Sequence, residues 1–214
     1  MQLYGYWRSS AAYRVRIALN LKGLSWDHVG VHLVRDGGEH LQDAYASRNP
    51  QKLVPTLVDG ELTLTQSMAI LEYLDEAYPE VPLLPADAAG RARVRAIAQA
   101  VACDIHPVDN LRILKYLGGP LGIEKEARDT WYAHWIHEGF AAIESLLTQS
   151  DATGDFCHGD APTQADCCLV PQVYNARRFE VDLSPYPTIE RIEQACLALP
   201  AFDAARPENQ PDAG

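Results

Sequence analysis

Arg8, Ser9 and Ser10 lie where a short strand-like segment gives way to an apolar-periodic segment, residues 11–21. The start of a helix offers free backbone N–H groups and the positive end of the helix dipole, so an anion such as a thiolate is favoured there. Serine is also a preferred helix cap, and capping alone is the simpler interpretation of either serine taken singly. Arg8 precedes the helix and is the better candidate for contact with a ligand.

Gln66 and Ser67 form a second such place, since Ser67 precedes another apolar-periodic segment and is predicted to be its N-cap. An amide, a hydroxyl and unpaired backbone donors would converge there on an anion. Val54-Pro55 lies just before a short strand, and a cis bond would present the Val54 backbone to an extended peptide, although trans is the default. The two helix starts together suit a ligand with separated anionic ends.

The elements that must position these residues alternate between strand and helix in the first 80 residues. Asp59-Gly60 is a strong hairpin-turn signal between two short apolar stretches. Arg14 and Arg16 are interpreted as solvated or ion-paired helix residues, the usual fate of charged side chains. The predicted order is βαβαββα, with strands or hairpin at residues 2–6, 26–33 and 53–64 and helices at 11–21, 39–48 and 67–78.

The remainder of the chain is predicted to be helical. Residues 79–85, PEVPLLP, hold three prolines and form an extended connector. We therefore expect an α/β domain over residues 1–80 and an all-α domain over residues 87–214. Its helical segments cover residues 91–117, interrupted at Pro107, and 125–147, with further starts near Thr163 and Thr188; Thr163 and Asp166 have the spacing of a capping box.

Net charge, cysteine spacing and the length of apolar runs each argue against one class of function. The 214 residues carry a formal net charge of −11, which argues against a nucleic-acid partner. The five cysteines have no CxxC spacing, so no metal is expected, and their odd number favours a reducing compartment, the cytoplasm. No apolar run approaches the ~18 residues of a membrane span.

Several motifs together carry a family resemblance. The chain is similar to zeta-class glutathione transferases in the segments YWRSSAAYRVRIAL, NPQKLVPTLVDG, TQSMAILEYL, PLLP, DIHPVDNL and GDAPTQADCCLVPQV. The resemblance implies a thioredoxin-like N-terminal domain and a helical C-terminal domain, which agrees with the elements predicted from periodicity. It also implies glutathione as cofactor and a homodimer.

The resemblance, together with the chemistry of the implied reaction, assigns expected roles to residues of this chain. Ser9 resembles the residue that holds the glutathione thiolate, with Ser10 as a possible substitute, and Arg8 is expected to stabilise the charge that develops on the substrate. Ala11 stands where one form of the signature has cysteine, and Asp109 stands where glutamine or asparagine is expected. The expected glutathione-binding residues are Val54, Gln66 and Ser67, with His40, Asp109 and Asn110 as weaker candidates. Arg177 or Arg178 is expected to clamp a substrate carboxylate, the alternative being a surface ion pair.

The implied activity is a glutathione-dependent cis/trans isomerisation of a maleyl diacid. Maleylacetoacetate, from tyrosine and phenylalanine degradation, is the leading substrate, and maleylpyruvate, from gentisate degradation, is the rival. Leu111 after Asn110 favours maleylacetoacetate, because a maleylpyruvate enzyme is expected to gather more arginine. Transfer of glutathione to halogenated acids, or a non-catalytic binding module, are the other readings; intact Ser9, Gln66 and Ser67 argue against the latter.

Overall fold

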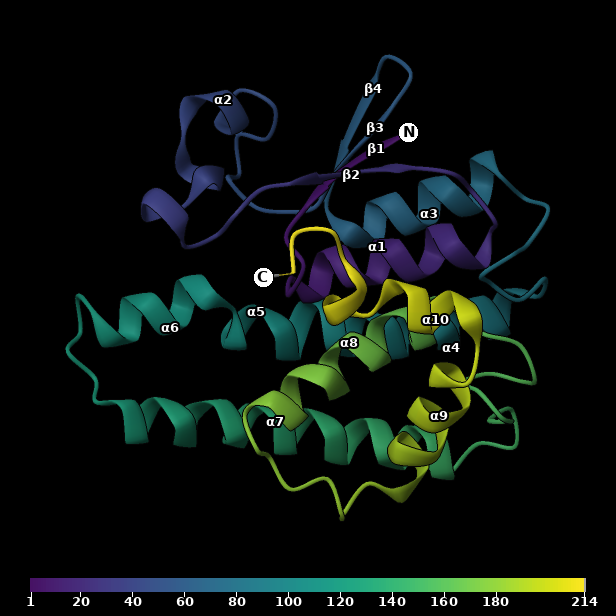
Figure 1. Cartoon of the computed structure of the whole chain (residues 1–214). Helices are drawn as coiled ribbons and strands as arrows, with labels where there is room; N and C mark the ends of the chain where they lie inside the picture. Colours follow the sequence, from purple (N-terminus) through teal and green to yellow (C-terminus); the bar gives the residue numbers. More distant parts are fainter. Residues whose placement is uncertain (214) are drawn as a thin grey trace. The chain divides into compact units, whose positions relative to one another are not determined.

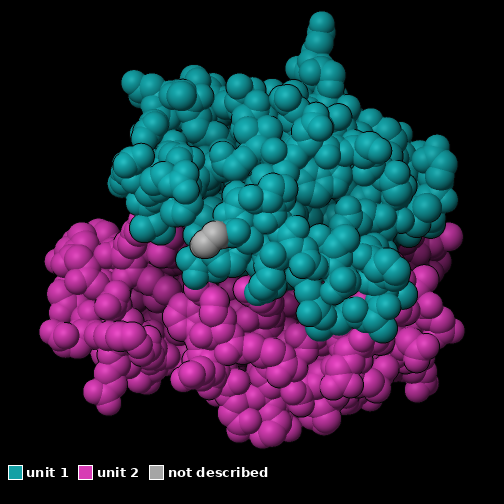
Figure 2. All heavy atoms as spheres, in the orientation of Figure 1, with its two compact units in different colours: residues 1–83, 197–214 teal, residues 84–196 magenta. Residues whose placement is uncertain are grey.

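The structure is a computed structural model that describes residues 1–213. Packing divides the chain into two compact units, coloured separately in Figure 2. Unit 1 is Met1–Leu83 together with Leu197–Gly214, and unit 2 is Leu84–Cys196. The change of unit at residues 83 and 84 falls within the proline-rich connector.

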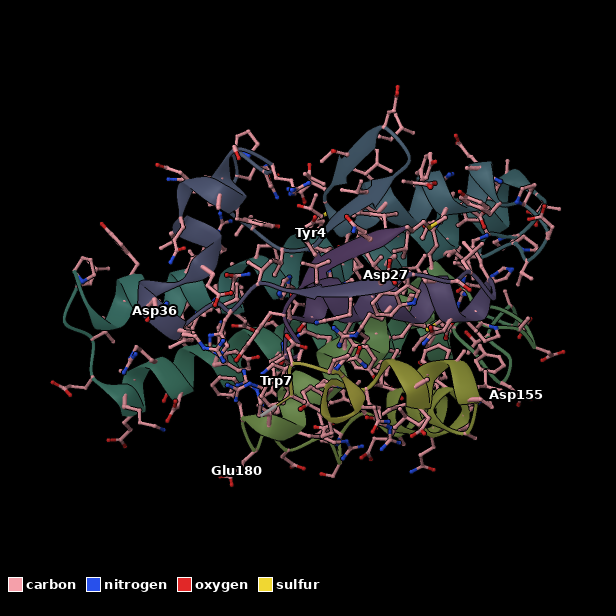
Figure 3. All side chains as sticks on the ribbon, turned by 45° about the horizontal axis from the view of Figure 1, so that its top comes forward. Tyr4, Trp7, Asp27, Asp36, Asp155 and Glu180 are labelled. Atoms are coloured by element: carbon pink, nitrogen blue, oxygen red, sulfur yellow. The ribbon has the colours of Figure 1, made fainter. Side chains whose placement is uncertain are left out.

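Unit 1 contains a four-stranded sheet in the order β2-β1-β3-β4. β1 (Gln2–Gly5) pairs in parallel with β2 (Asp27–Gly30), and Figure 3 labels Tyr4 and Asp27 on these two strands. β3 (Thr56–Asp59) runs antiparallel to β1 and forms a hairpin with β4 (Leu62–Thr65). Gly60 turns this hairpin with a φ of 58°, a conformation that glycine adopts without strain. The predicted hairpin turn is confirmed.

Two helices of unit 1 run side by side and start at the same end of the sheet, α1 (Ser10–Leu21) and α3 (Ser67–Ala77) (Figure 1). The βαβαββα order is the thioredoxin-like arrangement implied by the sequence. The polar helix expected over residues 39–48 is reduced to short pieces, η2 (Glu39–Leu41) and α2 (Asp43–Ala46), after η1 (Arg35–Gly37). The core between sheet and helices includes Leu3, Val15, Leu19, Leu57, Ile70 and Leu74, all fully buried.

The end of the described chain also belongs to unit 1. α10 (Pro200–Ala205) packs against α1, where Asn20 Nδ2 donates to the Ala201 carbonyl at 3.0 Å, and is followed by η4 (Pro207–Asn209). The sequence placed residues 87–214 in one helical domain. Those residues contain no strand within the described part, but their last stretch packs on the unit that holds the sheet.

Unit 2 is helical. Its first helix, α4 (Ala88–Gln99), runs into a π-helical segment, η3 (Ala100–Ile105), before Pro107 enters α5 (His106–Asp109). The expected interruption at Pro107 is therefore present. The remaining helices are α6 (Leu111–Gly118), α7 (Lys125–Thr148), α8 (Gln164–Arg178) and α9 (Pro187–Leu197).

Two further features of unit 2 bear on the sequence analysis. The capping box at the start of α8 is confirmed, since Thr163 and Asp166 exchange side-chain and backbone hydrogen bonds. Four of the five cysteines, all but Cys103, are buried, and all five are free thiols. Among the helices described in residues 1–213, none combines the length and the hydrophobicity that a membrane span requires.

Candidate functional site

Ser9 is the N-cap of α1. Its backbone is extended, and its Oγ accepts the Ala12 N–H at 3.2 Å. The capping interpretation is therefore correct for Ser9, but it leaves a second role open. The Ala12 bond uses an acceptor lone pair of the hydroxyl, so the Ser9 O–H proton can still be donated to an anion at the helix start. Ser10 is the first helical residue and is buried.

Arg8 is exposed on the loop between β1 and α1, but two neighbouring side chains hold its guanidinium in place. Its Nη2 donates to the Tyr6 hydroxyl at 3.2 Å, and its Cζ lies 4.5 Å from the centroid of the Trp7 ring. A guanidinium over an indole face is attracted by the ring quadrupole. The loop thus presents a positive charge next to the Ser9 hydroxyl along the chain.

The start of α3 differs from the prediction by one residue. Gln66, with a φ of 67°, is the N-cap position, and Ser67 is the first helical residue instead of the cap. The Gln66 side chain does not cap the helix; its Nε2 donates to Gln51 Oε1 at 2.8 Å. The backbone donors at this helix start are therefore not satisfied by a side-chain cap, which is a suitable arrangement for an anionic ligand.

Arg14 contradicts its assignment as a solvated or surface-paired residue. It is only 2% exposed, and its Nη1 donates to Ser67 Oγ at 3.2 Å. A side chain from the second turn of α1 therefore reaches the first residue of α3 and links the two helices by a buried hydrogen bond. Spacing along α1 gave no signal for this role, because the partner is 53 residues away.

The loop before β3 carries Val54, and the Val54-Pro55 peptide is cis, so the default expectation of trans was wrong. Two donors fix this loop at the preceding carbonyl, since Tyr45 Oη and Asn49 Nδ2 lie 2.6 and 2.7 Å from the Leu53 oxygen. Within residues 1–213, Val54 makes no backbone–backbone hydrogen bond. Its peptide groups are thus available to an extended ligand.

A small apolar cluster brings these loops together. Tyr6, Val31, Tyr45 and Val54 are buried against one another, and Trp7 packs on them. The cluster therefore joins the loop that carries Arg8 and Ser9 to the loop that carries Val54. His40 lies on η2, where its ring packs over Gly38.

Asp109 and Asn110 lie in unit 2, at the junction of α5 and α6. Asn110 is the N-cap of α6, and its side chain accepts the Arg112 N–H at 3.0 Å. Asp109 is 5% exposed, and neither of its carboxylate oxygens has a hydrogen-bond partner among residues 1–213. Burial raises the pKa of Asp109 to about 8. A protonated Asp109 is a neutral donor and acceptor, as the expected amide would be.

We expect Asp109→Asn to stabilise the protein increasingly as the pH rises from 5 to 8. The folded state keeps the Asp109 proton up to about pH 8, whereas the unfolded state releases it near the ordinary aspartate pKa of 3.8. Wild-type stability therefore falls over this window, by at most about 1.4 kcal/mol per pH unit, and an asparagine removes this contribution. Urea unfolding of both proteins at pH 5 and pH 8 measures it. A difference that does not grow with pH would contradict the assignment.

The two adjacent arginines at the end of α8 have different surroundings. Arg177 Nη2 lies 2.6 Å from Glu193 and 3.2 Å from Glu190, and its hydrogen bonds to Glu193 raise the pKa of Arg177. The ion-pair interpretation thus applies to Arg177. Arg178 is exposed, with its guanidinium 4.6 Å from the Phe179 ring centroid.

Arg178 also borders a hollow of about 870 Å³ on unit 2. Lys125, Asp129 and Thr130 from α7 share its lining with Phe179. Of the two arginines, only Arg178 lines this hollow. Within the described residues, no group of three or more His, Cys, Asp or Glu side chains is placed to hold a metal ion.

Comparison with known proteins identifies the family of the chain. Residues 3–82 match the family model for the N-terminal domain of glutathione S-transferases. A probable maleylacetoacetate isomerase of Vibrio cholerae serotype O1 is 54% identical over 99% of this chain and 97% of its own length.

Solved structures agree. A maleylpyruvate isomerase, described as a bacterial zeta-class glutathione transferase, superposes with a TM-score of 0.97 at 52% identity, over the whole of both chains. A maleylacetoacetate isomerase of Methylobacterium extorquens AM1, with bound malonate and glutathione, has a TM-score of 0.96 at 42% identity, again over both whole chains. The family, the class and the fold follow from these matches.

Proposed function

The chain belongs to the zeta class of the glutathione S-transferase family, and we propose that it isomerises maleylacetoacetate to fumarylacetoacetate with glutathione as cofactor, in tyrosine and phenylalanine degradation. The observation that carries the proposal is the pairing of two helix N-termini in unit 1. Ser9 is the N-cap of α1, Ser67 is the first residue of α3, and a buried hydrogen bond from Arg14 of α1 to Ser67 links the two helices. Full-length relatives of this activity support the choice of reaction.

The residues of unit 1 fit glutathione. The uncapped start of α3 at Gln66 and Ser67 would hold the γ-glutamyl carboxylate, and the unpaired peptide groups of Val54 would pair with the extended tripeptide. The start of α1 would hold the sulfur end. Bound glutathione supplies the thiol that permits reversible addition to the maleyl double bond. The protein itself offers no cysteine at the start of α1, where Ala11 follows Ser10.

Two side chains of the β1–α1 loop would stabilise negative charge during the reaction, one on the thiolate and one on the substrate. The Ser9 hydroxyl donates more strongly to a thiolate than to a thiol, which lowers the pKa of the bound thiol. The Arg8 guanidinium, held by Tyr6 and Trp7, offers a fixed positive charge to the carbonyl oxygen on which negative charge develops.

Maleylpyruvate is the alternative substrate. It is supported by the similarity to a maleylpyruvate isomerase that is 52% identical to this chain. Leu111, exposed at the start of α6, brings no positive charge and favours the longer acid. A spectroscopic assay of both maleyl acids, with and without glutathione, tests the proposal. Higher kcat/KM for maleylpyruvate would select the alternative, and turnover of neither acid would leave a transferase acting on halogenated acids.

Replacing Arg178 by Ala is expected to raise KM for the diacid by about 10- to 100-fold. This is the typical effect of losing a charge-assisted hydrogen bond to a carboxylate. Affinity for glutathione should hardly change. Arg177→Ala is the matched control, because Arg177 is occupied by Glu190 and Glu193 and should affect stability instead of KM. Steady-state kinetics with each substrate varied measures both. Equal effects of the two substitutions on KM would contradict a clamp at Arg178.

We further propose a homodimer in the cytoplasm. Five free thiols suit a reducing compartment, and the family resemblance supports the dimer. Sedimentation velocity at micromolar concentration should give the mass of two chains. A single-chain mass at that concentration would contradict the dimer.

A further inference from the structure

The C-terminal segment, residues 206–213, returns to the loop between β1 and α1 within unit 1. The Trp7 N–H donates to Asp212 Oδ2 at 3.0 Å, across 205 residues of sequence. The other oxygen of the same carboxylate, Oδ1, lies 2.8 Å from His28 Nε2 on β2. Figure 3 shows Trp7 beside this segment, which is drawn in yellow. Asp212 thus contacts both the loop that carries Arg8 and Ser9 and the strand β2.

The carbonyl of Trp7 is held as well. Arg16 Nη2 donates to the Trp7 oxygen at 2.9 Å, and Arg16 Nε donates to the Ala205 oxygen at 3.0 Å. Arg16 is fully buried, contrary to its assignment as a solvated or surface-paired helix residue. Both backbone polar groups of Trp7 are therefore tied, directly or through Arg16, to the C-terminal part of the chain.

The placement of Trp7 fixes its neighbours in the loop. Arg8 follows directly and lays its guanidinium over the Trp7 ring. Ser9 comes next, and its backbone is held locally: its N–H donates to the Tyr6 oxygen at 2.9 Å, and its carbonyl accepts the Tyr13 N–H at 2.8 Å. A change at Trp7 would therefore be passed to the two residues that carry the chemistry.

The surroundings of Asp212 suit a fixed acceptor. Its side chain is 21% exposed and that of His28 is 7% exposed, and Asp212 packs against Gly30, where no side chain intervenes. A carboxylate that accepts a backbone N–H makes a stronger hydrogen bond than a neutral acceptor. The Asp212 carboxylate thus packs against β2 and accepts the Trp7 N–H of the β1–α1 loop.

We propose that Asp212 is a positioning residue for glutathione activation, which fixes the Trp7 N–H and thereby the placement of Arg8 and Ser9. The proposal rests on the proposed role of Ser9. Asp212 touches the loop and not the reacting atoms, so it acts through the geometry of Trp7. Misplacement of a catalytic group by about 1 Å can cost about 10²-fold in rate.

The test compares Asp212→Ala with Asp212→Asn and with Asp203→Ala. Asparagine keeps an oxygen to accept from Trp7 and an amide to face a neutral His28. Asp203 lies in α10 of the same C-terminal region, and its side chain makes an exposed ion pair, 3.2 Å to Arg206, so it is the matched control. We measure the thiol pKa of bound glutathione, its Kd by calorimetry, kcat and thermal unfolding.

Asp212→Ala should raise the thiol pKa and lower kcat by about 10- to 100-fold, with a much smaller change in Kd. Asp212→Asn should recover most of the loss, and Asp203→Ala should match wild type. A merely structural role would lower thermal stability and leave the thiol pKa unchanged. Wild-type pKa and kcat in Asp212→Ala, or an equal loss in Asp212→Asn, would overturn the proposal.

Two further results keep the outcomes apart. If Asp212→Ala does not fold, hydrogen exchange in the wild type decides, because the proposal requires slow exchange at the Trp7 amide and fast exchange there would reject it. If the wild type lacks glutathione-dependent isomerisation but retains a protected Trp7 amide and a lowered thiol pKa, only the proposed reaction fails. If the wild type is active, the loss of kcat in Asp212→Ala tests only the positioning role of Asp212.

Discussion

Ser9→Ala should lower kcat by about 10² to 10³-fold and raise the pKa of bound glutathione toward that of the free thiol. The loss of one well-placed donor to developing or stabilised negative charge has this typical size. The Ser9 Oγ accepts from Ala12, so its proton is available for the thiolate. Glutathione affinity should fall far less than kcat, because the α3 N-terminus and the Val54 loop remain intact.

Three variants separate activation from capping. Loss of an N-cap costs about 1 kcal/mol of stability, which thermal unfolding of Ser9→Ala will show. Ser9→Thr keeps both cap and hydroxyl and should retain the lowered pKa. Ser10→Ala is the neighbouring control, and titration of thiolate absorbance is run for all three. A larger loss in Ser10→Ala would move the role to Ser10, and an unshifted pKa in Ser9→Ala would refute it.

Ser67→Ala should raise the Kd for glutathione by about 10- to 100-fold, the equivalent of a hydrogen bond to a charged group. Ser67 is buried at the start of α3, and its Oγ already accepts from Arg14, so its own proton can be given to a carboxylate. At saturating glutathione kcat should stay near the wild-type value. The two serines therefore give opposite patterns of Kd and kcat.

Calorimetry with glutathione measures the Ser67 effect directly. Ser47→Ala is a suitable control in the same unit, since the Ser47 hydroxyl donates an exposed hydrogen bond to the Ala44 carbonyl at 3.4 Å. An unchanged Kd in Ser67→Ala would exclude Ser67 from the ligand site. A fall in saturated kcat as large as that of Ser9→Ala would show that the two helix starts do not divide binding from activation.

The sequence predicted the features that depend on near neighbours. The Asp59-Gly60 turn, the capping box at Thr163 and the interruption at Pro107 each follow from contacts within a few residues, where turn chemistry and periodicity are informative. The two helix starts that carry Ser9 and Ser67 were found in the same way. The one-residue error at Gln66 arose because a residue with positive φ, and no side-chain cap, occupies the cap position.

The sequence could not supply contacts between distant residues. Arg14 and Arg16 share the helical periodicity of ordinary surface arginines, yet their partners lie 53 and 189 residues away and both side chains are buried. Asp212 lies in a polar, proline-containing stretch that local rules assign no role. Nor does spacing separate Arg177 from Arg178, because the difference is set by glutamates on the neighbouring α9.

Residues 197–213 belong to unit 1 but are synthesised last, and this affects how unit 1 forms while the chain is still on the ribosome. All four strands and both long helices of this unit precede residue 84, but α10 and Asp212 are made only after residues 84–196. At typical elongation rates that interval is on the order of ten seconds. During it the nascent chain has Arg16 without its Ala205 acceptor and Trp7 without its Asp212 acceptor. A chain stalled before Ala205 would therefore display Ser9 on a loop that is not yet held.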